Sequence, residues 1–253
     1  ENGRTVAYRN LDELARRTKS VMLRRLSADV MLQLPQRIDI NIFVPMTPEQ
    51  RDAHDSLRRQ AARLMDKWHR HHSLSEADRK QMLLTLSQMR MVCDSLYVLD
   101  ELSRSDTKVE ETMSLLEQCT HDSKVVVFSQ WERMTRLVAL ELDRSGIDYS
   151  YIHGSIPSDE RTRRIADFAG SDGTRLLLST DAGAAGLNLQ EADVVINLDM
   201  PWNQITRQQR LDTLSDRRRV LVYNLVAKDT IEEDMLSKPT LKTEFFEGAT
   251  YGD

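Results

Sequence analysis

Lys124-Val-Val-Val-Phe128 is a short apolar run rich in β-branched residues, and the polar pair Ser129-Gln130 follows it directly. Short runs of this composition, bounded by polar residues, predict buried β-strands. Four later runs have the same character: Tyr149-Ser-Tyr-Ile152, Thr174-Arg-Leu-Leu-Leu178, Asp193-Val-Val-Ile-Asn197 and Val220-Leu-Val-Tyr-Asn-Leu-Val226. The second half of the chain therefore contains a series of strands.

Segments with helical spacing separate most of these strands. Between Glu132 and Arg144 an apolar stripe recurs every three or four residues and ends before Gly146, a common helix stop. A second helix is predicted from Ser158 to Phe168, where Pro-Ser-Asp is a start signal. Strands that alternate with helices predict an α/β fold, in which a parallel sheet has helices on both faces.

The first half of the chain has a different pattern. Residues 37–44 alternate strictly between polar and apolar and predict one half-buried strand. A long helical pattern runs from Pro48 to about His72 and resumes through Leu102, and a further helix spans Thr107 to Gln118. We therefore expect a mostly helical extension over residues 1–106, an α/β domain over 107–236 and a C-terminal tail over 237–253.

The composition excludes several classes of protein. No apolar run approaches the roughly 20 residues of a membrane span, so no membrane partner is expected. Cys93 and Cys119 lack the paired spacing of a zinc site, and we expect no metal and a cytoplasmic location. The net charge is -5, but arginines cluster locally, as at Arg161, Arg163 and Arg164, and such clusters can face phosphates.

Two absences bear on nucleotide chemistry. The sequence contains no G-x-x-x-x-G-K-[ST] loop to cradle phosphates, and no acidic pair follows a strand as a magnesium site would require. If the chain belongs to a nucleotide-driven machine, another domain must supply the phosphate grip.

Polar and small residues follow successive predicted strands. They are Ser129-Gln130, His153-Gly-Ser155, the turn Ser179-Thr-Asp-Ala-Gly-Ala-Ala-Gly-Leu-Asn188, and Asp199-Met-Pro-Trp-Asn203. The carboxyl ends of parallel strands meet at one edge of the sheet, where open α/β folds bind their ligands. Each segment alone is a weak signal, but the ordered series predicts a binding edge.

The run from Lys124 to Glu233 resembles the second RecA-like lobe of Swi/Snf-type superfamily-two ATPases, including bacterial relatives that act on RNA polymerase or DNA. Further segments extend the resemblance over nearly the whole chain and imply that residues 1–106 include the inter-lobe segment of the family, and we expect a bacterial origin. The matching segments are Phe128-Ser-Gln130 (fourth motif), Ser179 to Leu189 (fifth), Asp199 to Asn203 (approach to the sixth), Thr230-Ile-Glu-Glu233, Met22-Leu-Arg-Arg25 with Leu34-Pro35, and Met89-Arg-Met-Val-Cys93.

The resemblance implies roles for individual residues. Gly186 and Asn188 match positions that approach the ribose and phosphates of ATP. The positions that hold the DNA backbone are matched by Ser129, Gln130, Gly154, Ser179 and Thr180. Trp202 matches a tryptophan that stacks on or wedges against a DNA strand, with core packing as the alternative. ATP with Mg²⁺ is the implied cofactor, bound only together with the missing first lobe and not by this chain alone.

The sixth motif departs from the family pattern. Relatives read approximately Gln-Arg-Ile-Gly-Arg-Leu-Asp-Arg-Ile-Gly-Gln, with two arginine fingers that neutralise charge on the transferred phosphate. This chain is about three residues shorter here, and the best fit places Arg210 at the first finger and Thr213 at the second. We expect Arg210 to be the catalytic residue of this lobe. A natural degenerate motor, an altered sequence and omitted residues all remain open explanations for the difference.

Three functional hypotheses follow. The first is the C-terminal lobe of an ATP-dependent duplex-DNA translocase, inactive alone, with the N-terminal lobe, duplex DNA and RNA polymerase or another DNA-bound protein as partners. The second is a degenerate, non-catalytic module that binds DNA or protein. The third is an RNA helicase of the same superfamily, which the Leu-Arg-Arg and Trp-Asn segments make less favoured. If the protein is bacterial, the first hypothesis implies association with the nucleoid.

Overall fold

The computed structural model describes residues 37–71, 73–104, 106–119, 123–184, 189–201 and 219–237, together with 206, 209, 210 and 213. The chain divides into residues 1–35 and 36–253, and every described residue belongs to the second unit. Gly186, Asn188 and Trp202, three of the predicted site residues, lie outside the described residues.

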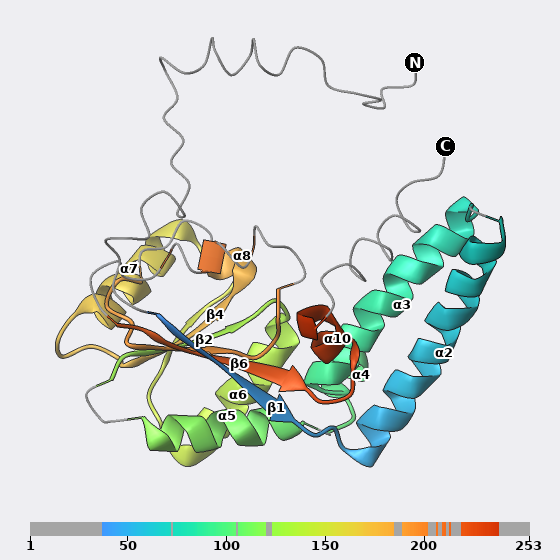
Figure 1. Cartoon of the computed structure of the whole chain (residues 1–253). Coiled ribbons are helices and arrows are strands. Elements are labelled where there is room, and N and C mark those ends of the chain that lie inside the picture. Colours follow the sequence, from blue (N-terminus) through green and yellow to red (C-terminus); the bar gives the residue numbers. More distant parts are fainter. Residues whose placement is uncertain are drawn as a thin grey trace, which may run out of the picture. The chain divides into compact units, whose positions relative to one another are not determined.

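A six-stranded parallel sheet forms the centre of this unit (Figure 1). Its strands are β1 (Ile38–Val44), β2 (Val125–Ser129), β3 (Ser150–Ile152), β4 (Leu176–Thr180), β5 (Val194–Asn197) and β6 (Leu221–Ala227). Their order is β1-β6-β5-β2-β4-β3, and every pairing between neighbours is parallel. The predicted α/β fold is therefore confirmed, and the parallel sheet is of the RecA-like type.

Helices cover both faces of the sheet, as the sequence predicts. On one face α5 (Thr107–Gln118) and α6 (Glu132–Ser145) pack against strand residues that include Val125 and Val127. On the other face α7 (Ser158–Ala169) packs through Phe168 against Val126 and Phe128, and α8 (Asp181–Ala184) lies near it (Figure 1). All five residues of β2 are buried because a central parallel strand contacts a helical layer on each side.

Helix α6 shows how local sequence sets these elements. Met134, Leu137, Val138 and Leu142 are fully buried and form the predicted stripe. The helix ends where Gly146 adopts a left-handed conformation with φ 64°, and its N–H bonds to the last carbonyl groups of the helix. Glycine adopts this conformation without the steric cost that a side chain imposes.

The helical extension is built on α2 (Pro48–His71) and α3 (Glu76–Asp94), which pack against each other and are followed by the short α4 (Tyr97–Asp100) (Figure 1). Helix α3 begins at a capping box: Ser75 accepts from the backbone N–H of Asp78, and Asp78 accepts from the backbone N–H of Ser75. The final helix, α10 (Ile231–Ser237), packs into the same cluster through Ile231.

Strand β1 precedes the helical extension in sequence but completes the sheet in space. It pairs with β6 over its full length, from Ile38 beside Leu221 to Val44 beside Ala227. The division at residue 106 stays a prediction, and the sheet draws on residues from both sides of it. No helix in the described ranges combines the length and the apolar character that crossing a membrane requires.

Candidate functional site

Arg210 lies at the carboxyl edge of the sheet and is only 4% exposed. Its Nε and Nη2 donate to the two carboxylate oxygens of Asp181 at 2.5 and 3.1 Å. Nη2 also donates to Oδ1 of Asp199 at 2.9 Å, and Nη1 donates to Asn197 Oδ1 and to the carbonyl of Asp199, each at 3.0 Å. A guanidinium has five N–H groups, and these five bonds occupy all of them.

Asp199 extends this network to the end of β2. Its Oδ2 accepts a short hydrogen bond from the Ser129 hydroxyl and a second, at 2.9 Å, from the backbone N–H of Gln130. Burial opposes ionisation of this carboxyl, but the charge of Arg210 and the Ser129 hydroxyl together hold the pKa of Asp199 below its usual value. One ionised carboxylate thus joins the ends of β2 and β5 to Arg210.

The residues predicted to hold DNA divide into two groups. Gly154 is exposed, and Gln130 is partly exposed although its Nε2 is buried without a hydrogen-bond partner. The hydroxyl groups of Ser129, Ser179 and Thr180 are buried instead. Ser179 donates to the carbonyl of Thr180, and Thr180 Oγ1 accepts from the backbone N–H of Gly183. In this arrangement those three hydroxyls hold the strand ends rather than face outward.

Close backbone contacts fix the position of α8 beside β3. A Cβ added to Gly183 would lie 2.7 Å from the carbonyl oxygen of Ile152, a distance that real Cβ atoms do not show. A Cβ on Gly154 would lie 3.3 Å from Cβ of Ala182. The small residues after β4 therefore allow the two strand ends to approach.

Thr213, at the predicted position of the second arginine finger, is also buried. Its hydroxyl donates to the carbonyl of Arg210 at 2.6 Å, and its own carbonyl accepts from the N–H of Leu189 at 2.7 Å. Thr213 thus connects the Arg210 segment to the residue that follows the glycine-rich turn, and it carries no charge for a phosphate.

Sequence reasoning missed the carboxylates of Asp181 and Asp199 as site residues. Both follow strand ends, Asp181 directly after β4 and Asp199 two residues after β5. That position was a usable signal, since ligand-binding side chains of parallel sheets lie there. Their shared cation could not be found from spacing, because it comes from a later segment that folds back onto both.

A second buried ionic cluster holds α5 to the rest of the unit. Lys108 Nζ donates to Asp94 Oδ1 at 2.7 Å, to the carbonyl of Leu198 at 2.7 Å and to Glu232 Oε2 at 2.8 Å. The three charged side chains are at most 1% exposed. Burial raises the pKa of Asp94 well above its usual value, and the nearby carboxylates of Asp199 and Glu232 act in the same direction against Lys108. Burial alone would lower the pKa of Lys108, but Asp94 and Glu232 raise it above its usual value.

The predicted arginine cluster on α7 is held by its own helix and its neighbours. Arg163 and Arg164 both pair with Glu160, at 2.5 and 2.9 Å, and Arg164 also donates to the carbonyl of Tyr151. Among the residues that the structure describes, no group of three histidine, cysteine or acidic side chains is placed to hold a metal ion.

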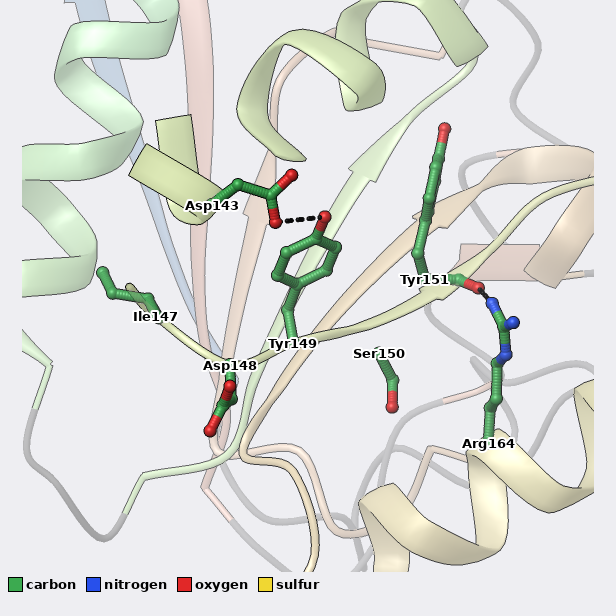
Figure 2. A pocket seen from close by; sticks show the side chains of 7 residues that line it. All are labelled: Asp143, Ile147, Asp148, Tyr149, Ser150, Tyr151 and Arg164. Atoms are coloured by element: carbon green, nitrogen blue, oxygen red, sulfur yellow. Dashed lines mark hydrogen bonds between the residues drawn. The ribbon is translucent and has the colours of Figure 1, made fainter. Parts of the chain in front are cut away.

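Figure 2 shows a separate hollow at β3, lined by Asp143, Ile147, Asp148, Tyr149, Ser150, Tyr151 and Arg164. Tyr149 donates to Asp143 at 3.0 Å across it, and Arg164 covers the backbone carbonyl of Tyr151. No predicted site residue lines this hollow. Other polar groups of the lining bond outside the hollow, as Ser150 does to Thr174 and the Tyr151 hydroxyl does to Thr135, and Arg164 occupies one backbone carbonyl of the edge strand β3.

Two family models match the chain. Residues 107–213 match the helicase conserved C-terminal domain, and residues 4–98 match the SNF2-related domain. The described network of Arg210, Asp181 and Asp199 lies within the first match.

Curated relatives are identical to this chain at about a quarter of the aligned positions. A chromodomain-helicase-DNA-binding protein 1-like protein of Danio rerio is 28% identical over 249 residues, which are 92% of this chain and 23% of that protein. The protein YwqA of Bacillus subtilis (strain 168) is 26% identical over 96% of this chain and 28% of its own length. The chain therefore spans about a quarter of the length of these relatives.

Solved structures share the fold. The C-terminal domain of a Sulfolobus solfataricus SWI2/SNF2 ATPase has a TM-score of 0.66 and 20% identity, covering 86% of this chain and 91% of that one. The core of a Sulfolobus solfataricus SWI2/SNF2 ATPase in complex with dsDNA has a TM-score of 0.67 and 21% identity, covering 95% and 54%. The chain therefore carries an SNF2-related region followed by a helicase conserved C-terminal domain, and it is similar to Swi/Snf-type ATPases.

Proposed function

We propose that this chain is the C-terminal lobe of an ATP-dependent duplex-DNA translocase and hydrolyses ATP only together with an N-terminal lobe. The observation that carries the proposal is the network in which Arg210 binds Asp181 and Asp199 while Asp199 holds Ser129 and Gln130. The network connects Arg210, which is expected to face ATP, with Ser129 and Gln130, which are expected to hold DNA. A conformational change on the ATP side can then move the residues on the DNA side, which a translocase requires.

Duplex DNA is the proposed partner. The related Sulfolobus solfataricus core in complex with dsDNA supports this choice, and so do the DNA-binding names of the curated relatives. Gly154, which is exposed, and Gln130, which is partly exposed and has an unpaired amide Nε2, are our candidates for contact with the DNA backbone. Ser129, Ser179 and Thr180 are proposed to support this DNA-facing surface by holding the strand ends in place, and Trp202 is proposed to stack on the duplex.

ATP is proposed to bind between this lobe and its N-terminal partner. Gly186 and Asn188 would approach the nucleotide from this side, and Mg²⁺ would enter with ATP on residues of the other lobe. Arg210 remains our candidate for the catalytic arginine, but its five bonds mean that it must first exchange a carboxylate for a phosphate oxygen. RNA polymerase or another DNA-bound protein is the further partner that we propose, in the cytoplasm and, if the protein is bacterial, at the nucleoid.

A titration of labelled duplex DNA over a salt series tests the DNA-binding part. We expect log K to fall linearly with log salt, with a slope of about -0.9 per phosphate neutralised. Gln130→Ala should weaken binding, whereas Gln118→Ala, on the exposed end of α5, should not. Absence of binding at low salt, or stronger binding to RNA than to duplex DNA, would contradict the proposal.

One observation favours a second function, a DNA- or protein-binding module without catalysis. Thr213 is the residue that we expect at the second finger position, and Arg210 has no N–H group left for a phosphate in this arrangement. The two functions separate in a protein in which this chain is joined to an N-terminal lobe. The motor is supported if DNA stimulates ATP hydrolysis and if Thr213→Arg with restoration of the missing residues increases it. DNA binding without ATP hydrolysis supports the non-catalytic module.

A further inference from the structure

Three asparagines from three adjacent strands lie side by side on one face of the sheet. Asn197 of β5 is the register partner of Asn224 of β6, and Asn224 is the register partner of Asn41 of β1. The positions two residues earlier on the first two strands are Val195 and Val222, both buried in an apolar cluster. Because side chains alternate along a strand, these amides occupy a face that is otherwise apolar.

The three amides form a continuous hydrogen-bond chain. Asn197 Nδ2 donates to Asn224 Oδ1 at 2.9 Å, and Asn224 Nδ2 donates to Asn41 Oδ1 at 3.0 Å. Asn197 is 7% exposed and Asn224 is 4% exposed, whereas Asn41 lies at the exposed edge of the sheet. Burying an amide costs free energy unless it is hydrogen-bonded, so the two inner amides depend on this chain.

Arg210 sets the direction of the chain. A guanidinium can only donate, so Asn197 must turn its Oδ1 toward Nη1 of Arg210. Its Nδ2 then faces Asn224, which must present an oxygen in turn, and the same constraint passes to Asn41. The orientation of each amide is thereby determined by the cation at one end.

We propose that Asn197, Asn224 and Asn41 are positioning residues that hold Arg210 in its orientation and couple it to the edge strand β1. The proposal rests on the proposed function, since it concerns the arginine expected to serve ATP hydrolysis. Asn41 belongs to the SNF2-related match, and Asn197 and Arg210 belong to the helicase C-terminal match. The three asparagines, which we call the asparagine ladder, therefore connect the two matched regions through hydrogen bonds. A shift of β1 along β6 would disturb the contacts of Arg210.

The direct test measures how freely the Arg210 guanidinium rotates about its Nε–Cζ bond, by NMR of the 253-residue chain labelled in its arginine side chains. Loss of one signal in Arg210→Lys assigns it. In Asn224→Leu we expect rotation about five- to tenfold faster, the factor that corresponds to weakening one hydrogen bond. Asn224→Asp should restore slow rotation, because a carboxylate still accepts from Asn197 and the exposed Asn41 can turn its amide to donate.

Leu225→Ala is the matched control. Leu225 is fully buried on the opposite face of the same strand, so this variant loosens the core without touching the ladder. Slow rotation in Leu225→Ala together with fast rotation in Asn224→Leu supports the proposal. Equal rates in the two variants, or a rate in Asn224→Leu equal to that of the unaltered chain, would overturn it.

Two additions keep the outcome decisive. If Asn224→Leu does not fold, Asn41→Ala removes only the last, exposed acceptor, and about twofold faster rotation of the Arg210 guanidinium is expected from lost cooperativity. An unchanged rotation rate would count against the ladder.

Titration with duplex DNA separates this proposal from the proposed function. Weaker binding by Asn224→Leu at an unchanged salt slope fits an indirect effect through Asp199, because no cation is removed. A chain that binds no DNA refutes the proposed function, while the NMR result still decides the ladder.

Discussion

Arg210 and Asp181, 29 residues apart in the chain, form a two-point ion pair in which Nε donates to Oδ1 at 2.5 Å and Nη2 donates to Oδ2 at 3.1 Å. The carboxylate of Asp199 completes the set of charges around the guanidinium at 2.9 Å. Arg210 is 4% and Asp199 is 1% exposed, whereas the side chain of Asp181 is 21% exposed, so water reaches this network on the Asp181 side. Geometry of this kind makes the cation a structural centre of the site as well as a candidate catalytic group.

Removing that cation should destabilise the protein strongly. Arg210→Ala leaves Asp199 buried without its cation, and we expect a loss of about 3–5 kcal/mol in the free energy of unfolding, measured by urea denaturation. Arg210→Lys keeps the charge but loses the fork that binds two carboxylates, so its loss should be intermediate. Arg163→Ala is the control, because Arg163 pairs with Glu160 on the surface with 72% of its side chain exposed. A loss in Arg210→Ala no larger than in Arg163→Ala would contradict the structural role.

The cluster around Lys108 should respond unequally to changes in its members. Lys108→Met leaves Asp94 and Glu232 buried without a cation, and we expect a loss of about 3–5 kcal/mol in the free energy of unfolding. Asp94→Asn should cost much less, because two carboxylates share one cation and burial already raises the pKa of Asp94. Thermal unfolding of the two variants side by side checks this order, and the reverse order would show that Asp94 is the essential partner.

Acid should weaken the fold through His54. This side chain is fully buried in α2, where burial and, to a smaller extent, the charge of Arg58 lower its pKa from 6.5 to about 4. The unfolded chain therefore binds a proton at higher pH than the folded chain does. The contribution of neutral His54 to the free energy of unfolding is complete above pH 6.5. It is lost as the pH falls toward 4, by about 3 kcal/mol in total.

Unfolding by urea at several pH values measures this effect. In His54→Gln the loss of stability between pH 6.5 and 4 should be smaller, while His71→Gln, at the exposed end of the same helix, should behave like the unaltered chain. If His54→Gln lost as much stability on acidification as the unaltered chain did, another group would be responsible.

The turn after β4 should not tolerate a side chain at Gly183. Gly183→Ala places a Cβ 2.7 Å from the carbonyl oxygen of Ile152, and we expect a loss of about 1–3 kcal/mol from overpacking. Gly154→Ala is the matched control, since its Cβ would meet only Cβ of Ala182 at 3.3 Å and should cost less. Calorimetric melting of the two variants tests the order, and equal melting temperatures would show that α8 can move away from β3.

Much of the fold is predictable because short-range patterns report it. Five buried runs and one alternating run correspond to the six strands, with boundaries that agree within two residues. The stripe of α6 and its stop at Gly146 are likewise local, since helix periodicity and a left-handed glycine depend on neighbouring residues only. The position of β1 beside β6 is not local, because no pattern within residues 38–44 specifies its partner strand.

The sequence predicts where the candidate site lies in the fold, but only some of the residues that form it. Parallel strands direct their carboxyl ends to one edge, so the polar segments after β2, β3, β4 and β5 could be brought together from sequence. Arg210 was named for its place in a family motif, whereas Asp181, Asp199 and Asn197 were not named for binding it. The roles assigned to Gly186, Asn188 and Trp202 stay predictions.

The amino-acid sequence by itself determined the strands, the helices, the parallel sheet and the edge at which polar groups gather, because periodicity and turn residues act over a few positions. Only the tertiary structure decided which charge meets which. Arg210 is bound by two carboxylates, Lys108 by two others, and three asparagines align across β5, β6 and β1. These contacts join residues far apart in the chain, and burial makes each pairing matter, since a buried polar group must find its partner within the fold.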